Sequence, residues 1–270
     1  MKSERKIVFI IIFVVLAAVF HFYNERQQVT EPDTGSMQVL EVVDGDTIVI
    51  DDGMKNRVRY LGIDTPELAW PDSPGDPLGA EAKEFNRRLV EGKNVRLEFD
   101  EEKYDVYGRL LAYVYVDGVL VSEEMLRAGL AIPLIIEPNK RHEGLLMEAA
   151  AEARQKRKGV WGDLDTLAPP SGNGDFLVEL DKAERHQGKR VVVRGKVTGV
   201  RKTKNVLVLD VEDKLEVVIF PDDFDNFEFF GIDPAADYEG KEIEVTGTVR
   251  VRKGKPGIVV DHPMLIRSPG

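Results

Sequence analysis

Short runs rich in β-branched residues, separated by turn residues, constrain the fold of this chain more than any other feature of the sequence. In the first half these runs cover residues 39–43, 47–50, 58–63, 95–99 and 110–116. Asp44-Gly45-Asp46 and Asp52-Gly53 separate the first three runs, and Asp117-Gly118 follows the last. Runs of this length between Asp and Gly residues are typical of strands joined by tight turns.

Helical segments are interspersed among these strands. Residues 81–90, 122–129 and 143–157 carry the apolar spacing or the end signals of helices. Ser122, which precedes two glutamates, is expected to start the second helix. Five strands with short helices between Met37 and Asp163 predict a small Greek-key barrel of the OB type. Such a domain is mainly β with helices, an α+β fold.

The second half has the same character. Residues 164–174 are rich in Pro, Gly and Ser and are expected to be a linker. A helix-like segment, Phe176–His186, then precedes five Val-rich and Ile-rich runs, at 190–200, 206–211, 215–220, 241–251 and 257–260. Residues 175–267 therefore predict a second OB-fold-like five-stranded barrel, with an insertion between its third and fourth strands.

The N-terminus predicts export. Lys2, Arg5 and Lys6 precede an apolar run from Ile7 to Phe20. This charge pattern keeps the N-terminus in the cytoplasm and places the rest of the chain outside. We expect residues 1–23 to be a hydrophobic anchor, which contacts the membrane through 7–23, and residues 24–36 to be a linker. The alternative is a signal segment cleaved after Ala18, which would give a secreted protein.

The composition excludes some kinds of function. The chain has 48 acidic and 37 basic residues, a net charge of −11, so its overall field repels polyanions. Any action on nucleic acid must then rest on locally placed cations or on a metal ion. The absence of cysteine excludes disulfides, thiolate metal sites and cysteine nucleophiles.

One group of charged residues could perform chemistry together. Asp46 and Asp64 end two predicted strands and could offer hard oxygen ligands to Ca²⁺. Glu67 could accept a proton from an attacking water, and Arg59 and Arg109 could hold a phosphate. Each of these residues alone is more typical of a turn, a loop or a solvated surface. One barrel rim that gathers all five predicts a phosphodiester-cleaving site.

Three motifs resemble those of the thermonuclease (staphylococcal nuclease-like) family. They are Asp44–Thr47, Arg59–Glu67 and Asp105–Tyr113, and the resemblance extends from Met37 to Asp163. It implies a Ca²⁺-dependent endonuclease that cleaves DNA and/or RNA and leaves 3′-phosphates. It further implies roles for individual residues: Asp46, Asp64 and the Thr65 carbonyl as Ca²⁺ ligands, Glu67 as general base, Arg59 and Arg109 at the scissile phosphate, Tyr107 at a phosphate, and Asp44 as a support behind the ligands.

The chain departs from that family in its substrate contacts. The family's prototype has tyrosines that stack on the nucleotide base at the positions of Leu134 and Ile136. Stacking contributes ~1–3 kcal/mol per base, so we expect weaker, apolar contacts to the substrate here. The catalytic set itself is intact.

Residues 175–267 resemble, more loosely, the OB-fold modules that follow such nucleases in some chains. Two alternatives remain open for the basic residues of this region, which could form a groove for single strands or a solvated face. They are Arg194, Lys196, Arg201, Lys202, Lys204, Arg250, Arg252, Lys253 and Lys255. A catalytically weak protein that binds nucleic acid or acts in the cell envelope is the alternative to an enzyme. No protein partner is predicted.

Overall fold

The computed structural model describes residues 35–164 and 176–268. The predicted N-terminal anchor or signal segment, residues 1–23, lies outside these ranges, as does most of the linker that follows it. Within the described ranges, no helix has the length and apolar character needed to cross a membrane. The described residues from Ser36 onward form one compact unit that contains two barrels.

The first barrel is closed by five strands in the order predicted for an OB-type fold. Antiparallel pairings join β1 to β2, β2 to β3, β5 to β6 and β1 to β5, and the parallel pairing of β3 with β6 closes the barrel. The strands are β1 (Met37–Val42), β2 (Thr47–Ile50), β3 (Arg57–Tyr60), β5 (Asn94–Glu98) and β6 (Leu110–Val116).

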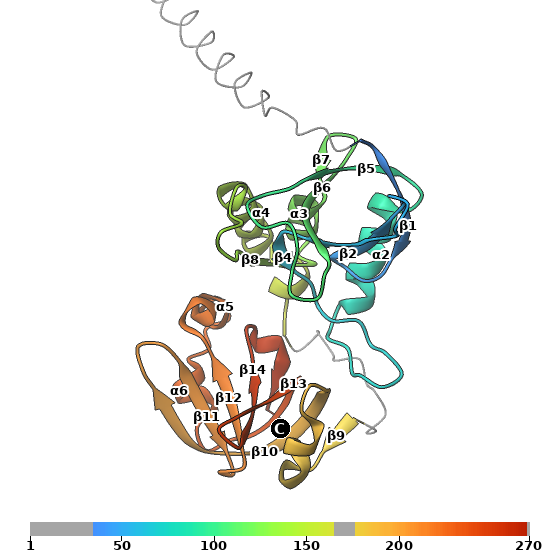
Figure 1. The fold of residues 1–270 in the computed structure, drawn as a ribbon. Helices are drawn as coiled ribbons and strands as arrows, with labels where there is room; N and C mark the ends of the chain where they lie inside the picture. Colours follow the sequence, from blue (N-terminus) through green and yellow to red (C-terminus); the bar gives the residue numbers. More distant parts are fainter. Residues whose placement is uncertain (1–34, 165–175, 269–270) are drawn as a thin grey trace, which may run out of the picture. The chain divides into compact units, whose positions relative to one another are not determined.

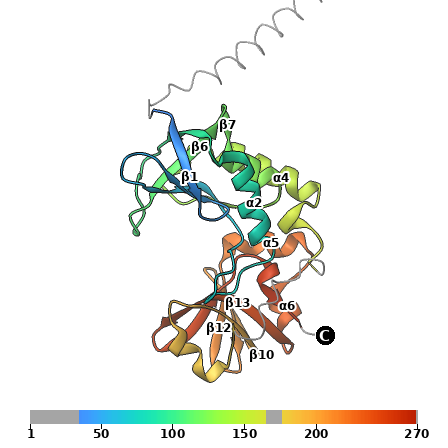
Figure 2. The same ribbon diagram turned by 90° about the vertical axis from the view of Figure 1, so that its right-hand side faces the viewer.

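Shorter elements surround this barrel. They are β4 (Gly62–Asp64), α2 (Gly79–Val90), β7 (Val119–Leu120), α3 (Val121–Arg127), β8 (Ile132–Leu134), α4 (Glu143–Gln155) and the 3₁₀ helix η1 (Gly159–Trp161). Helix α2 lies beside β1 in both ribbon views (Figures 1 and 2). Its apolar face, with Ala82 and Val90 fully buried, covers the barrel because an amphipathic helix must bury that face.

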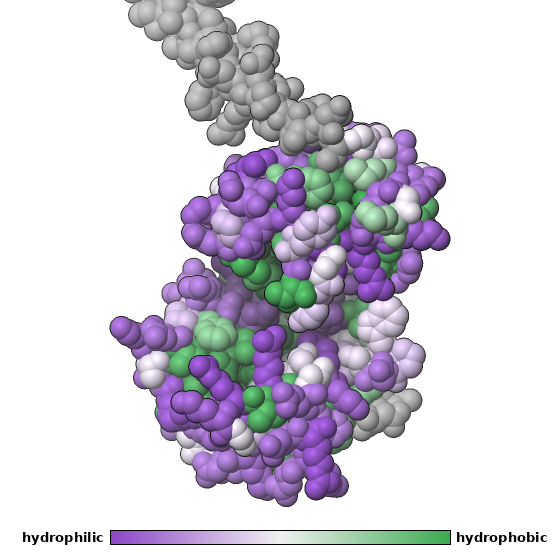
Figure 3. Space-filling view, in the orientation of Figure 1, coloured by the Kyte–Doolittle hydropathy of each residue, from purple (hydrophilic) through white to green (hydrophobic). Residues whose placement is uncertain are grey.

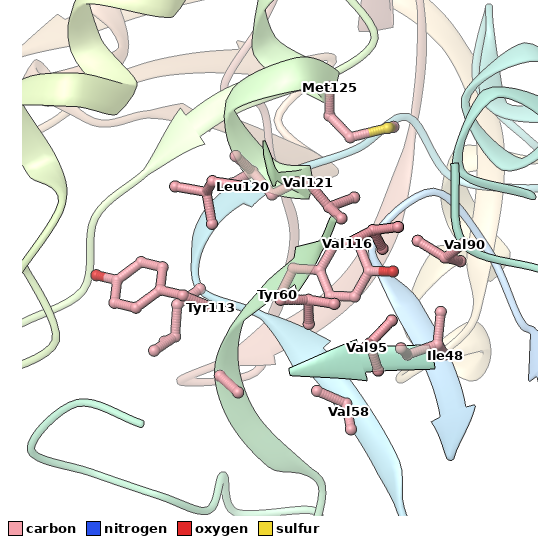
Figure 4. Close-up of a cluster of buried hydrophobic side chains, with 14 of the residues drawn as sticks. Ile48, Val58, Tyr60, Val90, Val95, Tyr113, Val116, Leu120, Val121 and Met125 are labelled. Carbon is pink, nitrogen blue, oxygen red and sulfur yellow. The ribbon is translucent and has the colours of Figure 1, made fainter. Parts of the chain in front are cut away.

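The core of the first barrel consists of the inward-facing residues of its strands, supplemented by α3. Figure 4 shows Ile48, Val58 and Val95 gathered around the ring of Tyr60. The Tyr60 hydroxyl donates a hydrogen bond of 3.0 Å to Oδ1 of Asn86 on α2, which satisfies both buried polar groups. This bond fixes α2 against the end of β3, the strand that carries Arg59.

The second barrel repeats the same strand connectivity. Antiparallel pairings join β10 to β11, β11 to β12, β13 to β14 and β10 to β13, and the parallel pairing of β12 with β14 closes it. Its strands are β10 (Arg190–Lys202), β11 (Leu207–Val211), β12 (Leu215–Ile219), β13 (Glu242–Arg252) and β14 (Lys255–Val259). The prediction of two five-stranded barrels is therefore confirmed.

Short elements complete the second barrel. They are β9 (Leu177–Val178), the 3₁₀ helices η3 (Leu180–His186), η4 (Pro221–Asp223) and η5 (Pro263–Leu265), α5 (Phe224–Phe229), α6 (Pro234–Tyr238) and β15 (Ile266–Arg267). Helices α5 and α6 form the insertion expected between the third and fourth strands. The visible face of the protein is largely hydrophilic (Figure 3), as its charged composition requires.

The two barrels pack against each other through an apolar cluster. The buried ring of Trp161, at the end of the first barrel's domain, meets the rings of Phe229 and His262 edge-on at centroid distances of 5.5 and 5.2 Å. The Arg154 guanidinium lies 4.1 Å from the Trp161 ring centroid and donates a hydrogen bond to Oδ1 of Asn226. This packed contact places the edge of the second barrel beside the first.

Three local predictions were wrong. Residues 58–63 are not one strand, because Gly62 adopts a φ of +82° and turns the chain into β4, which pairs with β8. Ser122 does not start its helix: α3 begins at Val121, and the buried Ser122 hydroxyl donates instead to the Leu61 carbonyl at 3.0 Å. Residues 176–186 form β9 and the 3₁₀ helix η3 in place of an α-helix.

Candidate nuclease site on the rim of the first barrel

Arg59 is the central residue of the site. It lies on β3, and its guanidinium contacts Oδ2 of Asp46 at 3.1 Å and Oδ1 of Asp64 at 2.5 Å. The same group donates hydrogen bonds to the carbonyls of Tyr60 at 3.0 Å and Ile63 at 2.8 Å. The turn at Gly62 bends the chain back, so these carbonyls and Asp64 surround the guanidinium. The structure thus brings together the two predicted metal-binding aspartates and one predicted phosphate-binding arginine.

Asp46 is held rigidly at the start of β2. Its Oδ2 accepts hydrogen bonds from the Thr65 backbone N–H at 3.0 Å and the Thr65 hydroxyl at 2.9 Å, and its Oδ1 accepts one from Thr47 at 3.1 Å. Gly45 permits this approach, because a Cβ at that position would lie 2.6 Å from Oγ1 of Thr65. The turn between β1 and β2 is therefore locked onto the segment that follows β4.

Asp44 contacts Asp46 from the turn between β1 and β2. Its Oδ1 accepts a hydrogen bond of 3.0 Å from the Asp46 N–H, and its backbone carbonyl accepts one of 3.0 Å from Asn86. Burial and the nearby Asp46 carboxylate raise the pKa of Asp44 to about 6. Burial also raises the pKa of Asp64, an effect that Arg59 opposes and Asp46 reinforces. Three carboxyl groups, those of Asp44, Asp46 and Asp64, therefore lie near one buried guanidinium.

Glu67 and Asp64 open into a cavity of about 100 Å³, which we call the acid cavity. It is lined on the first barrel by Asp64, Thr65, Glu67 and Asp76, and on the second by Arg190 and Asp261. Glu67 remains exposed to solvent within it. Burial raises the pKa of Glu67, Arg190 opposes this shift, and Asp76 adds to it. A space of this size accommodates a few water molecules but no nucleotide.

Arg59 and Arg109 share a larger hollow of about 310 Å³, which we call the arginine hollow. Its other lining residues include the three predicted substrate contacts Tyr107, Leu134 and Ile136. Their side chains are exposed, and the guanidinium of Arg109 lies 5.7 Å from the Tyr107 ring centroid. This hollow has the size of a small-molecule pocket, and its largely apolar wall carries two arginines together with Glu102, Asp105 and Asn139.

Several supporting residues were missed in the sequence. Asp105 accepts hydrogen bonds from the backbone N–H of Arg109 at 2.8 Å and from its Nε at 2.6 Å, which aims the guanidinium. Burial works against these bonds, but they prevail and lower the pKa of Asp105. Asn139 holds the same loop through both polar groups of its side chain, bonded to the backbone of Glu102. Asp105 lies four residues before Arg109, and this spacing of opposite charges could have predicted their contact.

Three of the nine basic residues named above for the second barrel are paired with acids. Arg201 and Lys255 both contact Asp210 and Glu216, and Arg194 contacts Glu244 at 2.7 Å. These carboxylates cancel the positive potential that a groove for single strands requires. The pairing favours a solvated charged face over a nucleic-acid groove at these positions.

The donors around Asp46 fit a hard cation in their chemistry. The carboxylates of Asp46 and Asp64 and the carbonyl of Thr65 are all oxygen ligands, the type that Ca²⁺ prefers. The side chain of Asp64 is 38% exposed, so water or an ion can reach it. In the described part of the chain, no three acidic or histidine side chains form a ready-made cation cage, and Arg59 joins the two aspartates.

A closed OB-type barrel whose rim brings Arg59 into contact with two aspartates, with Arg109 on the same hollow, has the residue types expected of a nuclease. Comparison with known proteins agrees. Residues 57–163 match the family model for the staphylococcal nuclease homologue. The thermonuclease of Staphylococcus intermedius is 35% identical over 166 residues, which cover 60% of this chain and 99% of that protein. The chain belongs to the staphylococcal nuclease family.

Two further relatives support this membership. The thermonuclease of Staphylococcus hyicus is 37% identical over 127 residues, 47% of this chain and 75% of that protein. Endonuclease YncB of Bacillus subtilis (strain 168) is 44% identical over 135 residues, 49% of this chain and 64% of that protein.

Proposed function

We propose that this protein is a calcium-dependent endonuclease that hydrolyses phosphodiester bonds of DNA and/or RNA and leaves 3′-phosphates. The observation that carries the proposal is the contact of Arg59 with both Asp46 and Asp64 on the wall of a hollow shared with Arg109. Relatives named thermonuclease and endonuclease support the same activity. A cation-binding acid pair and two phosphate-binding arginines would supply the positive charge and the hydrogen-bond donors that stabilise the transition state of this reaction.

The proposed roles follow from the two spaces. Asp46, Asp64 and the Thr65 carbonyl would hold Ca²⁺, with Asp44 behind them, and the ion would supply positive charge to the phosphate. Arg59 and Arg109 would bind the phosphate oxygens from the arginine hollow and stabilise the charge that develops there. Glu67 would hold a water of the acid cavity and accept its proton on a carboxylate oxygen. The new bond to phosphorus forms as the bond to the 5′ oxygen breaks.

The nucleotide would rest on Tyr107, Leu134 and Ile136, which line the arginine hollow. Tyr107 would contact a phosphate, and the two aliphatic side chains would contact a base without stacking. Because stacking is worth ~1–3 kcal/mol per base, substrate binding should be weak and should depend strongly on salt.

We also propose that the chain acts outside the cytoplasm. The basic residues Lys2, Arg5 and Lys6 before the apolar run support this orientation. An uncleaved segment would anchor the protein through residues 7–23, whereas cleavage would release it. Sequencing the N-terminus of the mature chain distinguishes the two, and a start near Val19 would contradict the anchor.

Calcium removal tests the proposed function. The protein should degrade plasmid and single-stranded DNA with Ca²⁺ present, and an excess of chelator should abolish this, because two neighbouring carboxylates need a cation to hold a phosphate. Restoring Ca²⁺ should restore cleavage, and the products should carry 3′-phosphates. Glu41 is an exposed carboxylate on β1. The Glu41→Gln protein, which loses one negative charge away from the site, should show the same dependence on Ca²⁺ as the wild type. DNA binding without cleavage in Ca²⁺ would favour the binding-only alternative and refute the enzyme.

A further inference from the structure

The loop that carries Glu67 closes at Asp76, through the backbone and the side chain of that residue. The Glu67 N–H donates to Oδ2 of Asp76 at 2.9 Å, and the Asp76 N–H donates to the Glu67 carbonyl at 2.8 Å. Gly79 allows the return of the chain, because a Cβ there would lie 2.2 Å from the Glu67 carbonyl oxygen. The position of the Glu67 N–H therefore depends in part on where the Asp76 carboxylate is held.

The second barrel supplies the partner of that carboxylate. Arg190, the first residue of β10, donates from Nη2 to Oδ1 of Asp76. The two side chains are only 14% and 5% exposed, so this is a nearly buried ion pair. Removing one partner from such a pair leaves an uncompensated buried charge, which is unfavourable. Without Arg190 the Asp76 carboxylate would lose the contact that fixes its Oδ1, and the bond from its Oδ2 to the Glu67 N–H would be held less firmly.

The placement of Arg190 is itself fixed by packing. β10 pairs with β13 along seven residues that begin at Arg190, and the contact of Trp161 with Phe229 and His262 holds the barrels together nearby. Arg190 therefore contacts Asp76 from a paired strand of the second barrel. It also lines the acid cavity beside Glu67, so it lies where the proposed reaction needs its water.

We propose that Arg190 of the second barrel is a positioning residue of the nuclease site, which acts on Glu67 through Asp76. This inference rests on the proposed role of Glu67. The second barrel would then contribute to the reaction even if it does not bind nucleic acid itself. A shift of about 1 Å in a reacting group can cost about 10²-fold in rate, so the ion pair has a measurable kinetic effect.

The test replaces Arg190 with glutamine in the full chain. Arg190→Gln should lower kcat about 10- to 100-fold and leave KM within about twofold, because Glu67 is misplaced while the arginine hollow is intact. Arg194→Gln, four residues along the same strand and paired with Glu244, is the matched control and should retain the full rate. Arg190→Lys, which keeps the charge, should recover part of the loss.

The double variant Arg190→Gln, Glu67→Gln distinguishes a role through Glu67 from a role in substrate binding or stability. If Arg190 acts through Glu67, Arg190→Gln should not reduce the residual rate of the Glu67→Gln protein any further. An equal reduction in both backgrounds would overturn the proposal, because Arg190 would then act on the substrate or on stability. A rise in the rate of Arg190→Gln would also overturn it and would make the second barrel an inhibitory cover.

Amide exchange gives a measurement that does not depend on activity. The Glu67 N–H, which is bonded to Asp76, should exchange faster in Arg190→Gln than in the wild type, while amides of β3 keep their protection. Unchanged exchange at Glu67 would overturn the positioning role even in a protein that cleaves DNA. Faster exchange in a protein that cleaves nothing would leave the link intact and refute the proposed function alone.

Discussion

Arg59→Ala should lower kcat/KM for a single-stranded oligonucleotide by at least about 10³-fold in saturating Ca²⁺. Loss of a single donor to a developing oxyanion typically costs about 10²–10³-fold, and Arg59 would supply a guanidinium with several donors. The substitution also removes the guanidinium that contacts both Asp46 and Asp64, a contact that Ca²⁺ on the two carboxylates would replace only in part. Loss of the guanidinium reduces binding of the phosphate and stabilisation of its transition state.

Arg57→Ala is the matched control, because Arg57 lies two residues earlier on the same strand and is exposed. Its rate should stay close to that of the wild type, and thermal unfolding should confirm that both variants are folded. A folded Arg59→Ala protein that keeps more than about a tenth of the wild-type rate would show that Arg59 has a structural role only.

Glu67→Gln should lower kcat about 10²- to 10⁴-fold, the range that a positioned general base supplies, with little change in KM. Glutamine has the same shape but cannot accept the proton of the attacking water. Because the Glu67 side chain is exposed in the acid cavity, the change should leave stability almost unaltered. Single-turnover kinetics on a short oligonucleotide measure the chemical step directly.

Glu41→Gln again provides the control for charge. If Glu67→Gln raised KM without lowering kcat, Glu67 would act in substrate binding, which would contradict its role as a base. Retention of the full single-turnover rate would remove Glu67 from the reaction altogether.

Much of the fold was predictable because its signals are local. Runs rich in β-branched residues marked the five strands of each barrel, and Asp-Gly turns separated strands of the first. The hairpin at Asp117-Gly118 formed as expected. The errors arose where tertiary contacts override local preference. Gly62 splits one predicted strand so that β4 can pair with β8, and Ser122 is used inside the core to bond the Leu61 carbonyl.

The roles of the site residues stay predictions, but part of their arrangement could be expected from the sequence. Spacing identified Arg59, Asp46 and Asp64, and the fold brings them into direct contact. The division into an acid cavity and an arginine hollow depends on how the chain bends at Gly62, which spacing cannot show. Arg190 could not be found at all, because it lies 114 residues from Asp76 and meets it only through the packing of two barrels.

The central claim is that Arg59 and Arg109 act on one phosphate beside a cation held by Asp46 and Asp64. A crystal structure with Ca²⁺ and a nucleoside 3′,5′-bisphosphate tests it most directly. We predict that one phosphate accepts hydrogen bonds of about 3 Å from both guanidinium groups, with the cation on the two aspartates and the Thr65 carbonyl. A phosphate bound elsewhere, or a cation that leaves Asp46 and Asp64 joined only to Arg59, would contradict the account.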